Sequence, residues 1–314
     1  MKTAILFPGQ GSQVVGMGQD VFRESEAAHR IFTLADEALG ESLTNLCFEG
    51  PQEALNLTAN TQPALLATSA ALVNTLLATV DLDITFIAGH SLGEYTALWF
   101  AGAFDIQTAI RLVRIRGEAM QNATPEGVGA MAAVIGLEED DIRAICLEAA
   151  DGEVVTPANF NAPGQIVVSG HRGAVERAVE LASAKGARKS VMLPVSAPFH
   201  CPLMQPAAER MKAELAAIDP GDVLSPVVCN VTAEPMENEP DAIRNALVTQ
   251  IVSPVQWVRS IRTMADQGVE LFLEIGPGKV LTTLAKRIAP DIQRMNISDL
   301  MGIQKFIDFL WESQ

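Results

Sequence analysis

Short apolar runs and longer amphipathic runs alternate along most of this chain. Short, continuous apolar runs are typical of buried strands, whereas apolar residues that recur every three or four positions are typical of helices. The first hundred positions predict, in order, strand Thr3–Phe7, helix Glu24–Leu39, helix Ala64–Leu77, strand Ile84–Ala88 and helix Ser91–Ala101. This alternation predicts a mainly parallel sheet that is covered by helices.

The same alternation returns near the C-terminus. The predicted strands are Val227–Val231, Val269–Ile275 and Arg294–Ile297, and the predicted helices between them are Ala242–Ile251, Val255–Gln267 and Lys279–Ile288. The two ends of the chain are therefore expected to build one α/β domain together.

A different order of elements occupies the middle of the chain. The patterns there predict strand Ala130–Ile135, helix Glu138–Ala150, strands Val154–Asn159 and Gln165–Ser169, helix Gly173–Lys185 and strand Ser190–Pro194. This βαββαβ order is that of a ferredoxin-like unit, and turn-forming stretches at 124–127 and 196–198 flank it. We expect a discontinuous large domain over 1–126 and 197–314, with a ferredoxin-like insert at 127–196.

Composition narrows the class of protein. Hydrophobic residues make up 48% of the chain but aromatic residues only 5%, so the core is expected to consist of Ala, Val, Leu, Ile and Met. A net charge of -16 disfavours nucleic acid and anionic membranes as partners, because clustered Lys and Arg bind phosphate groups. No apolar stretch is long enough to span a bilayer, and no signal-peptide cleavage site is recognisable near the N-terminus. These features predict a soluble, cytoplasmic protein.

The four cysteines, which lack any CxxC pair, predict reduced and mostly buried thiols. Cys47, Cys146, Cys201 and Cys229 lie far apart. Neither a zinc site nor a disulfide framework is indicated by this spacing.

The sequence GHSLG at 89–93 follows a predicted strand and opens a predicted helix. This strand-turn-helix context is that of a nucleophile elbow, in which a tight turn exposes a serine hydroxyl and the helix N-terminus offers amide donors to an oxyanion. Ser91 is therefore the candidate nucleophile. The alternative is an ordinary turn in which Ser91 caps the helix.

A serine nucleophile needs a base, and only four histidines can supply an imidazole. His29 lies in a charged amphipathic helix, His90 adjoins the nucleophile, and His171 starts a helix of the insert. His200 lies in a proline-bracketed loop and is the best candidate, with a solvent-facing or capping role as the alternative. No acidic residue between Ser91 and His200 is a convincing third member of a triad.

Two glycine-rich loops bear on the question of cofactors. The loop FPGQGSQ at 7–13 has the flexible backbone that an oxyanion donor needs, and its GxG is not a dinucleotide fingerprint because Val14 stands at the last glycine position. The loop GPGKV at 276–280 is not a P-loop, because Val280 replaces the magnesium-binding Ser or Thr. We expect no nucleotide cofactor and no metal.

Six motifs in order then carry a resemblance that spans essentially the whole chain. They are FPGQGSQ at 7–13, GHSLGE at 89–94, RxRGxxM at 114–120, NFNAPGQ at 159–165, PxSxPFH at 194–200 and EIGPG at 274–278. Together they resemble malonyl-CoA:acyl carrier protein transacylases. The resemblance implies a hydrolase-like large domain, and transfer of a malonyl group from malonyl-CoA to the thiol of acyl carrier protein through an ester on Ser91.

The resemblance also implies roles for individual residues. His200 would be the base, steadied by the backbone carbonyl of Gln250 in place of a carboxylate. The backbone amides of Gln10 and Leu92 would form the oxyanion hole. Arg116 would bind the malonyl carboxylate, a task that suits a planar two-pronged donor; on sequence alone, a surface ion pair is the alternative.

Other residues of the motifs are less specific. Asn159, Asn161 and Gln165 match a stretch that lies near the cleft in the family, so contact with coenzyme A is one reading and a structural turn is the other. Phe199 resembles the bulky residue of malonyl-type enzymes, which disfavours larger acyl groups. Cys201 departs from the small polar residue that is common in the family.

Two further functions compete with transfer to a carrier. A serine thioesterase or esterase would share Ser91 and His200 but use water, and it would have no need of Arg116. A non-catalytic subunit that docks a carrier protein would keep the fold without turnover, although it should have lost one of the two residues. The sequence does not identify the pathway, whether fatty acid, polyketide or polyunsaturated lipid synthesis.

The carrier protein poses an electrostatic problem. Acyl carrier protein resembles an acidic helical bundle, and two acidic proteins repel each other at long range. We expect a local basic patch on a monomeric enzyme, formed by insert residues and by residues across the cleft, namely Lys185, Arg188, Lys189, Lys286 and Arg287.

Overall fold

Two compact units make up the chain in its computed structural model, which describes residues 1–195 and 197–312. One unit comprises residues 1–117, 220–229 and those from 262 onward, and the other comprises residues 118–219 and 230–261. The second unit is larger than the predicted 127–196 insert, because 197–219 and 230–261 also belong to it. The proposed domain boundaries themselves remain a prediction, and Ser196, at one of them, lies outside the described residues.

A five-stranded parallel sheet forms the centre of the first unit. Its order is β7-β2-β1-β8-β9, and every neighbouring pair is parallel. The strands are β1 (Thr3–Phe7), β2 (Ile84–Gly89), β7 (Val227–Val228), β8 (Leu271–Ile275) and β9 (Gln293–Ile297). All residues of β1 and β8 are buried, as expected for central strands with helices on both faces.

The carboxyl ends of three adjacent strands bring three of the motifs together. FPGQGSQ follows β1, GHSLGE follows β2, and EIGPG ends β8. A Cβ at Gly276 would lie 2.5 Å from the Pro8 ring, so the first and third loops are in contact. Parallel α/β sheets bind ligands at this edge.

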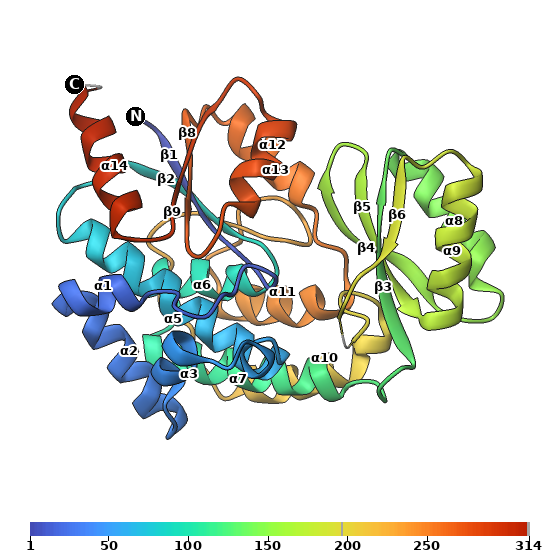
Figure 1. Cartoon of the computed structure of the whole chain (residues 1–314), viewed down its shortest axis with the longest axis horizontal. Helices are drawn as coiled ribbons and strands as arrows, with labels where there is room; N and C mark the ends of the chain where they lie inside the picture. The colour runs from blue at the N-terminus through green and yellow to red at the C-terminus, as the bar shows by residue number, and fades with distance from the viewer. Residues whose placement is uncertain (196, 313–314) are drawn as a thin grey trace. The chain divides into compact units, whose positions relative to one another are not determined.

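Helices of the first unit flank this sheet (Figure 1). They are α1 (Gln19–Glu24), α2 (Glu26–Leu39), α3 (Leu43–Glu49), α4 (Gln52–Leu55), α5 (Thr58–Leu77), α6 (Leu92–Phe100), α13 (Val280–Ile288) and α14 (Leu300–Glu312). Two more, α7 (Ile106–Asn122) and α12 (Trp257–Asp266), contain the boundaries between the units. The nearly all-buried α5 is the longest of the described helices.

The second unit contains a four-stranded antiparallel sheet in the order β4-β5-β3-β6. Its elements are β3 (Gly129–Ile135), α8 (Glu139–Ala150), β4 (Val155–Ala162), β5 (Gln165–His171), α9 (Arg172–Ala184) and β6 (Lys189–Met192). Both helices cover one face of this sheet around an apolar core (Figure 1). The predicted ferredoxin-like βαββαβ unit is therefore confirmed.

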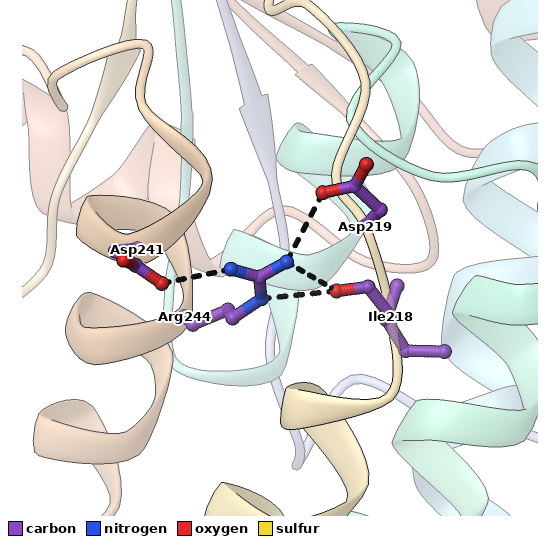
Figure 2. Close-up of polar contacts among 4 residues, drawn as sticks. All are labelled: Ile218, Asp219, Asp241 and Arg244. Atoms are coloured by element: carbon purple, nitrogen blue, oxygen red, sulfur yellow. Dashed lines mark hydrogen bonds and ion pairs between the residues drawn. The ribbon is translucent and has the colours of Figure 1, made fainter.

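A helical segment completes the second unit. It consists of the short 3-10 helix η1 (Pro202–Met204), α10 (Gln205–Ala216) and α11 (Pro240–Val252). Arg244 of α11 donates through Nε and Nη2 to the Ile218 carbonyl, at 2.9 and 2.7 Å, just beyond the end of α10 (Figure 2). The same guanidinium contacts Asp219 at 3.1 Å and Asp241 at 2.8 Å. One side chain thus ties α11 to the end of α10.

Some element boundaries differ from the predicted ones. The predicted helix 24–39 is divided at Ser25, whose hydroxyl caps α2 by accepting from the Ala28 amide at 3.3 Å. Helix α5 begins at Thr58, before Pro63, and not after it as expected. The strand predicted over 227–231 is limited to Val227–Val228. Helices α3, α4, α10 and α14 had no counterpart among the predicted elements, and α1 shares only Glu24 with the predicted helix 24–39.

Among the helices of residues 1–195 and 197–312, none combines the length and the apolar character needed to cross a membrane.

Candidate active site

Ser91 lies in a strained turn between β2 and α6. Its backbone has φ 52° and ψ -106°, outside the regions that non-glycine residues ordinarily adopt. The hydroxyl is half-buried, and α6 begins at the next residue, Leu92. This is the geometry of a nucleophile elbow, as the GHSLG sequence predicted.

The two glycines of the elbow allow close approach of backbone segments. A Cβ on Gly89 would lie 1.9 Å from the carbonyl of Gly93, and a Cβ on Gly93 would lie 2.2 Å from the Phe7 carbonyl oxygen. The Phe7 oxygen also accepts from the His90 amide at 3.1 Å. Gly89 is therefore required by close packing within the elbow and Gly93 by its packing against β1, and neither is there for a left-handed backbone.

Arg116 lies beside the nucleophile. It is 1% exposed, and its Nη2 donates to Ser91 Oγ at 3.1 Å. The guanidinium carbon lies 5.4 Å from the centre of the buried Tyr95 ring. Burial lowers the pKa of Arg116, whereas Tyr95 and Glu94 oppose that shift. The alternative of a surface ion pair for Arg116 is excluded by its burial.

The start of α5 holds Arg116 from the other side. Arg116 Nη1 donates to Gln62 Oε1 at 2.8 Å, and Arg114, two residues earlier, hydrogen bonds to Asn60. Gly117, the next residue after Arg116, lets the two helices approach closely, since a Cβ there would lie 2.6 Å from the Thr58 carbonyl oxygen. The RxRG sequence thus docks α7 on the first turns of α5.

The predicted oxyanion donors lie on two segments of the first unit. Leu92 is the first residue of α6, where amides have no partner within the helix and the helix dipole favours negative charge. Gln10 follows β1, and its side-chain Nε2 donates to Thr58 Oγ1 at 3.2 Å. The role of these two backbone amides stays a prediction.

His200 and Gln250 meet in the second unit. His200 is 3% exposed and has a left-handed φ of 59°, and its Nδ1 lies 2.9 Å from the Gln250 carbonyl oxygen. A carbonyl oxygen only accepts, so Nδ1 carries the proton and Nε2 keeps a lone pair that can receive one. Gln250 is fully buried near the end of α11. That its carbonyl replaces a triad carboxylate stays a prediction from the resemblance.

Two of the other histidines have structural contacts. The His29 ring stacks on Phe22 with a centroid distance of 4.6 Å. His171 Nδ1 accepts from the Val154 amide at 2.9 Å, just before β4. These contacts agree with the elimination that selected His200 as the candidate base.

The NFNAPGQ stretch forms the hairpin between β4 and β5. Pro163 and Gly164 make its turn, and Gly164 has a left-handed φ of 65°. Asn159 is 7% exposed, and its backbone forms an isolated parallel β-bridge with Val255. Asn161 is half-buried on β4. The hairpin accounts for the Pro-Gly pair, and a contact of Asn161 with coenzyme A stays a prediction.

Cys201 follows the candidate base but has a buried and unreactive thiol. It is fully buried, and its Sγ donates to the Pro198 carbonyl at 3.1 Å. Burial raises the pKa of its thiol. The departure from a small polar residue therefore places a protonated thiol next to His200.

The residues of the expected basic patch are all exposed. In the second unit, Lys185, Arg188 and Lys189 lie at the end of α9 and the start of β6, and Lys185 Nζ is 3.9 Å from a Glu148 carboxylate oxygen. In the first unit, Lys286 and Arg287 belong to the last turn of α13. Their docking role is untested.

Sequence reasoning missed Gln62, Thr58 and Tyr95, which hold Gln10 and Arg116 in place. Tyr95 could have been found from its position one turn into the elbow helix. The only signal for Gln62 is a polar residue that begins a long apolar stretch, and such a residue most often caps a helix or faces a loop.

Comparison with known proteins identifies the family of this chain. A family model described as "Acyl transferase domain" matches residues 5–305. The chain therefore belongs to the acyl transferase family. The malonyl CoA-acyl carrier protein transacylase of Escherichia coli (strain K12) is 51% identical over 285 residues, which are 91% of this chain and 92% of the relative.

Solved structures agree with this placement. The acyl-carrier-protein-S-malonyltransferase of Bartonella henselae superposes with a TM-score of 0.95 and 45% identity over 99% of both chains. A malonyl-transacylase in complex with a type II PKS acyl-carrier protein gives 0.96 and 44%, over 98% of this chain and 99% of that chain. The resemblance carried by the motifs and the α/β fold predicted from the alternation of apolar runs are both confirmed.

Proposed function

We propose that this chain transfers a malonyl group from malonyl-CoA to the phosphopantetheine thiol of an acyl carrier protein. The observation that carries the proposal is the buried Arg116 guanidinium, 3.1 Å from the hydroxyl of the strained Ser91. A buried cation beside a nucleophile favours an acyl group that carries its own negative charge. The names of the relatives support the same substrate.

The first half-reaction would form an ester on Ser91. His200 Nε2 takes the proton of the hydroxyl while Oγ attacks the thioester carbonyl, and the amides of Gln10 and Leu92 stabilise the oxyanion. Collapse of the intermediate breaks the carbon–sulfur bond, and His200 returns the proton to the departing coenzyme A thiolate. The Gln250 carbonyl keeps the proton on Nδ1 during both steps.

The second half-reaction would reverse the first with a different thiol. The carrier's phosphopantetheine thiol gives its proton to His200 and attacks the ester carbonyl. The bond to Ser91 Oγ then breaks, His200 returns the proton to that oxygen, and malonyl-carrier is formed. Throughout the cycle Arg116 would pair with the terminal carboxylate of the acyl group. No separate cofactor is needed, because both thiols belong to substrates.

The carrier protein is proposed to dock on the exposed basic residues Lys185, Arg188, Lys189, Lys286 and Arg287. Against a net charge of -16, such residues would give an acidic carrier local attraction. A solved relative was captured with its type II PKS carrier protein, which supports a fatty acid or polyketide pathway. All four cysteines are buried and none forms a disulfide, which suits a cytoplasmic enzyme.

The experiment is intact mass spectrometry of the protein after mixing with malonyl-CoA, with acetyl-CoA as the uncharged comparison and Ser91→Ala as the control. We expect a malonyl adduct that exceeds the acetyl adduct and is absent from Ser91→Ala. Release of coenzyme A without any adduct would indicate the thioesterase. Neither adduct nor release would indicate a non-catalytic docking subunit.

A further inference from the structure

Gln62 is in direct contact with the group that is proposed to bind the acyl carboxylate. Its side chain is 1% exposed, and its Oε1 accepts from Arg116 Nη1 at 2.8 Å, while the other terminal nitrogen of Arg116 reaches Ser91 Oγ. The two contacts lie on the two ends of one planar guanidinium. Gln62 therefore fixes the direction in which Arg116 faces the nucleophile.

We propose that Gln62 is a positioning residue that sets the preference of this enzyme for an anionic acyl group. This inference rests on the proposed function and goes beyond it, because it assigns acyl selectivity to a residue that acts through Arg116. The substrate class it favours is a short dicarboxylic acid joined to coenzyme A as a monothioester.

The neutrality of Gln62 is the essential property. An amide oxygen orients the guanidinium by one hydrogen bond without cancelling its charge. A carboxylate at the same distance would form an ion pair with Arg116 and compete with the carboxylate of the substrate. Since Glu94 already attracts the guanidinium, a second carboxylate would make this group of side chains net negative and repel the carboxylate of the acyl group.

The surrounding fold makes this orientation rigid. The guanidinium packs on the buried Tyr95 ring, and Gly117 and Arg114 dock α7 on the residues that precede Gln62. Arg116 thus has a fixed plane and a fixed neighbour on α5. Loss of the Gln62 hydrogen bond would let the guanidinium rotate about its long side chain, with a loss of alignment toward Ser91.

The test uses two variants of nearly the same size. Gln62→Glu adds a charge and Gln62→Met removes the hydrogen bond. Thr68→Val is the matched control. Thr68 is a fully buried polar residue of the same helix, and its hydroxyl donates to the Ala64 carbonyl at 2.8 Å. Single-turnover rates of Ser91 acylation are measured for each with malonyl-CoA and with acetyl-CoA.

The predicted result is a change in selectivity. Malonyl loading should fall about 100-fold in Gln62→Glu and about tenfold in Gln62→Met, as expected when a buried charged hydrogen bond is disturbed. Acetyl loading should change by less than about threefold, and Thr68→Val should keep the wild-type ratio. Equal losses for both acyl groups would show a merely structural role and overturn the inference.

Failure of the inference and failure of the proposed function are distinguishable. If the wild-type protein forms a malonyl ester on Ser91 and Gln62→Glu keeps its preference for malonyl, the assignment of Gln62 is wrong and the transferase stands. If the wild-type protein forms no malonyl ester, the proposed function is wrong, and the assignment of Gln62 is withdrawn with it.

Discussion

The two candidate catalytic residues have similar backbones but are held in different ways. Ser91 and His200 both have a left-handed φ, 52° and 59°. The turn of Ser91 is held by close backbone packing at Gly89 and Gly93, whereas the His200 ring has a hydrogen bond to the Gln250 carbonyl. The nucleophile therefore depends on small residues around it, and the base depends on a main-chain atom.

The difference implies that side chains matter unequally at the two places. Any atom added to the elbow glycines must displace backbone, while a change of side chain at Gln250 leaves its carbonyl in place. Substitutions should therefore be severe at the elbow and mild at Gln250, with loss of the imidazole itself the most damaging to turnover.

The largest effect is expected for His200→Ala. Without the imidazole, neither the Ser91 hydroxyl nor the departing thiolate exchanges its proton, so kcat/KM should fall by about 10³- to 10⁴-fold. Steady-state malonyl transfer at several pH values measures this loss, and circular dichroism checks the fold. A loss of less than about tenfold would exclude His200 as the base.

The second-largest effect is expected for Gly93→Ala, because the added Cβ would clash with the backbone of β1. The new Cβ would lie 2.2 Å from the Phe7 carbonyl oxygen, so β1 and α6 must separate. We expect a loss of about 3 kcal/mol in the free energy of unfolding, measured by urea denaturation, together with most of the activity.

Gly173→Ala of α9 is the matched control. There the nearest atoms to a new Cβ are the Glu153 carboxylate at 3.1 Å and Arg177 at 3.4 Å, both ends of flexible side chains. Stability should stay within about 1 kcal/mol of wild type or rise slightly, as Gly to Ala changes in helices often do. Equal losses in both variants would contradict the packing argument.

Gln250→Met should have a modest effect, because the His200 bond uses the main chain. Transfer activity is expected to stay within about fivefold of wild type, since a volume-conserving change in a buried site costs little when the carbonyl remains. The pH profile of kcat/KM should keep its shape. A changed profile would show that the Gln250 side chain also acts on the base.

The smallest effect is expected for Arg244→Gln, at the far end of the helix that carries Gln250 (Figure 2). The ion pairs to Asp219 and Asp241 are exposed and contribute little, so the lost bonds to the Ile218 carbonyl dominate. Stability should fall by about 1 kcal/mol and kcat by about two- to threefold. An unchanged midpoint in urea would show that Arg244 does not hold α11.

Features that depend on residues adjacent in the chain can be predicted from the sequence, whereas contacts between distant residues cannot. The elbow was predictable because strand, turn and helix are adjacent in the chain, and the βαββαβ order because its elements follow one another. Helix α1 was missed and the start of α2 was placed two residues early, because the Ser25 cap between them was not recognised.

Contacts between distant positions account for the rest. Gln62 and Arg116 are 54 positions apart, and neither residue type indicates the other. The His200 partner is a main-chain carbonyl 50 positions away, which any residue type could provide, so only the resemblance pointed to it. The start of α5 was placed too late because Pro63 is more often found at a boundary than inside a helix.

The central claim is that Ser91 and Arg116 load a malonyl group for delivery to a thiol and not to water. The most direct measurement is a single-turnover chase of the isolated malonyl enzyme with holo acyl carrier protein, with the products separated by mass. The account predicts that malonyl-carrier forms at least about 100-fold faster than malonate. Release of malonate at the same rate with and without the carrier would contradict it.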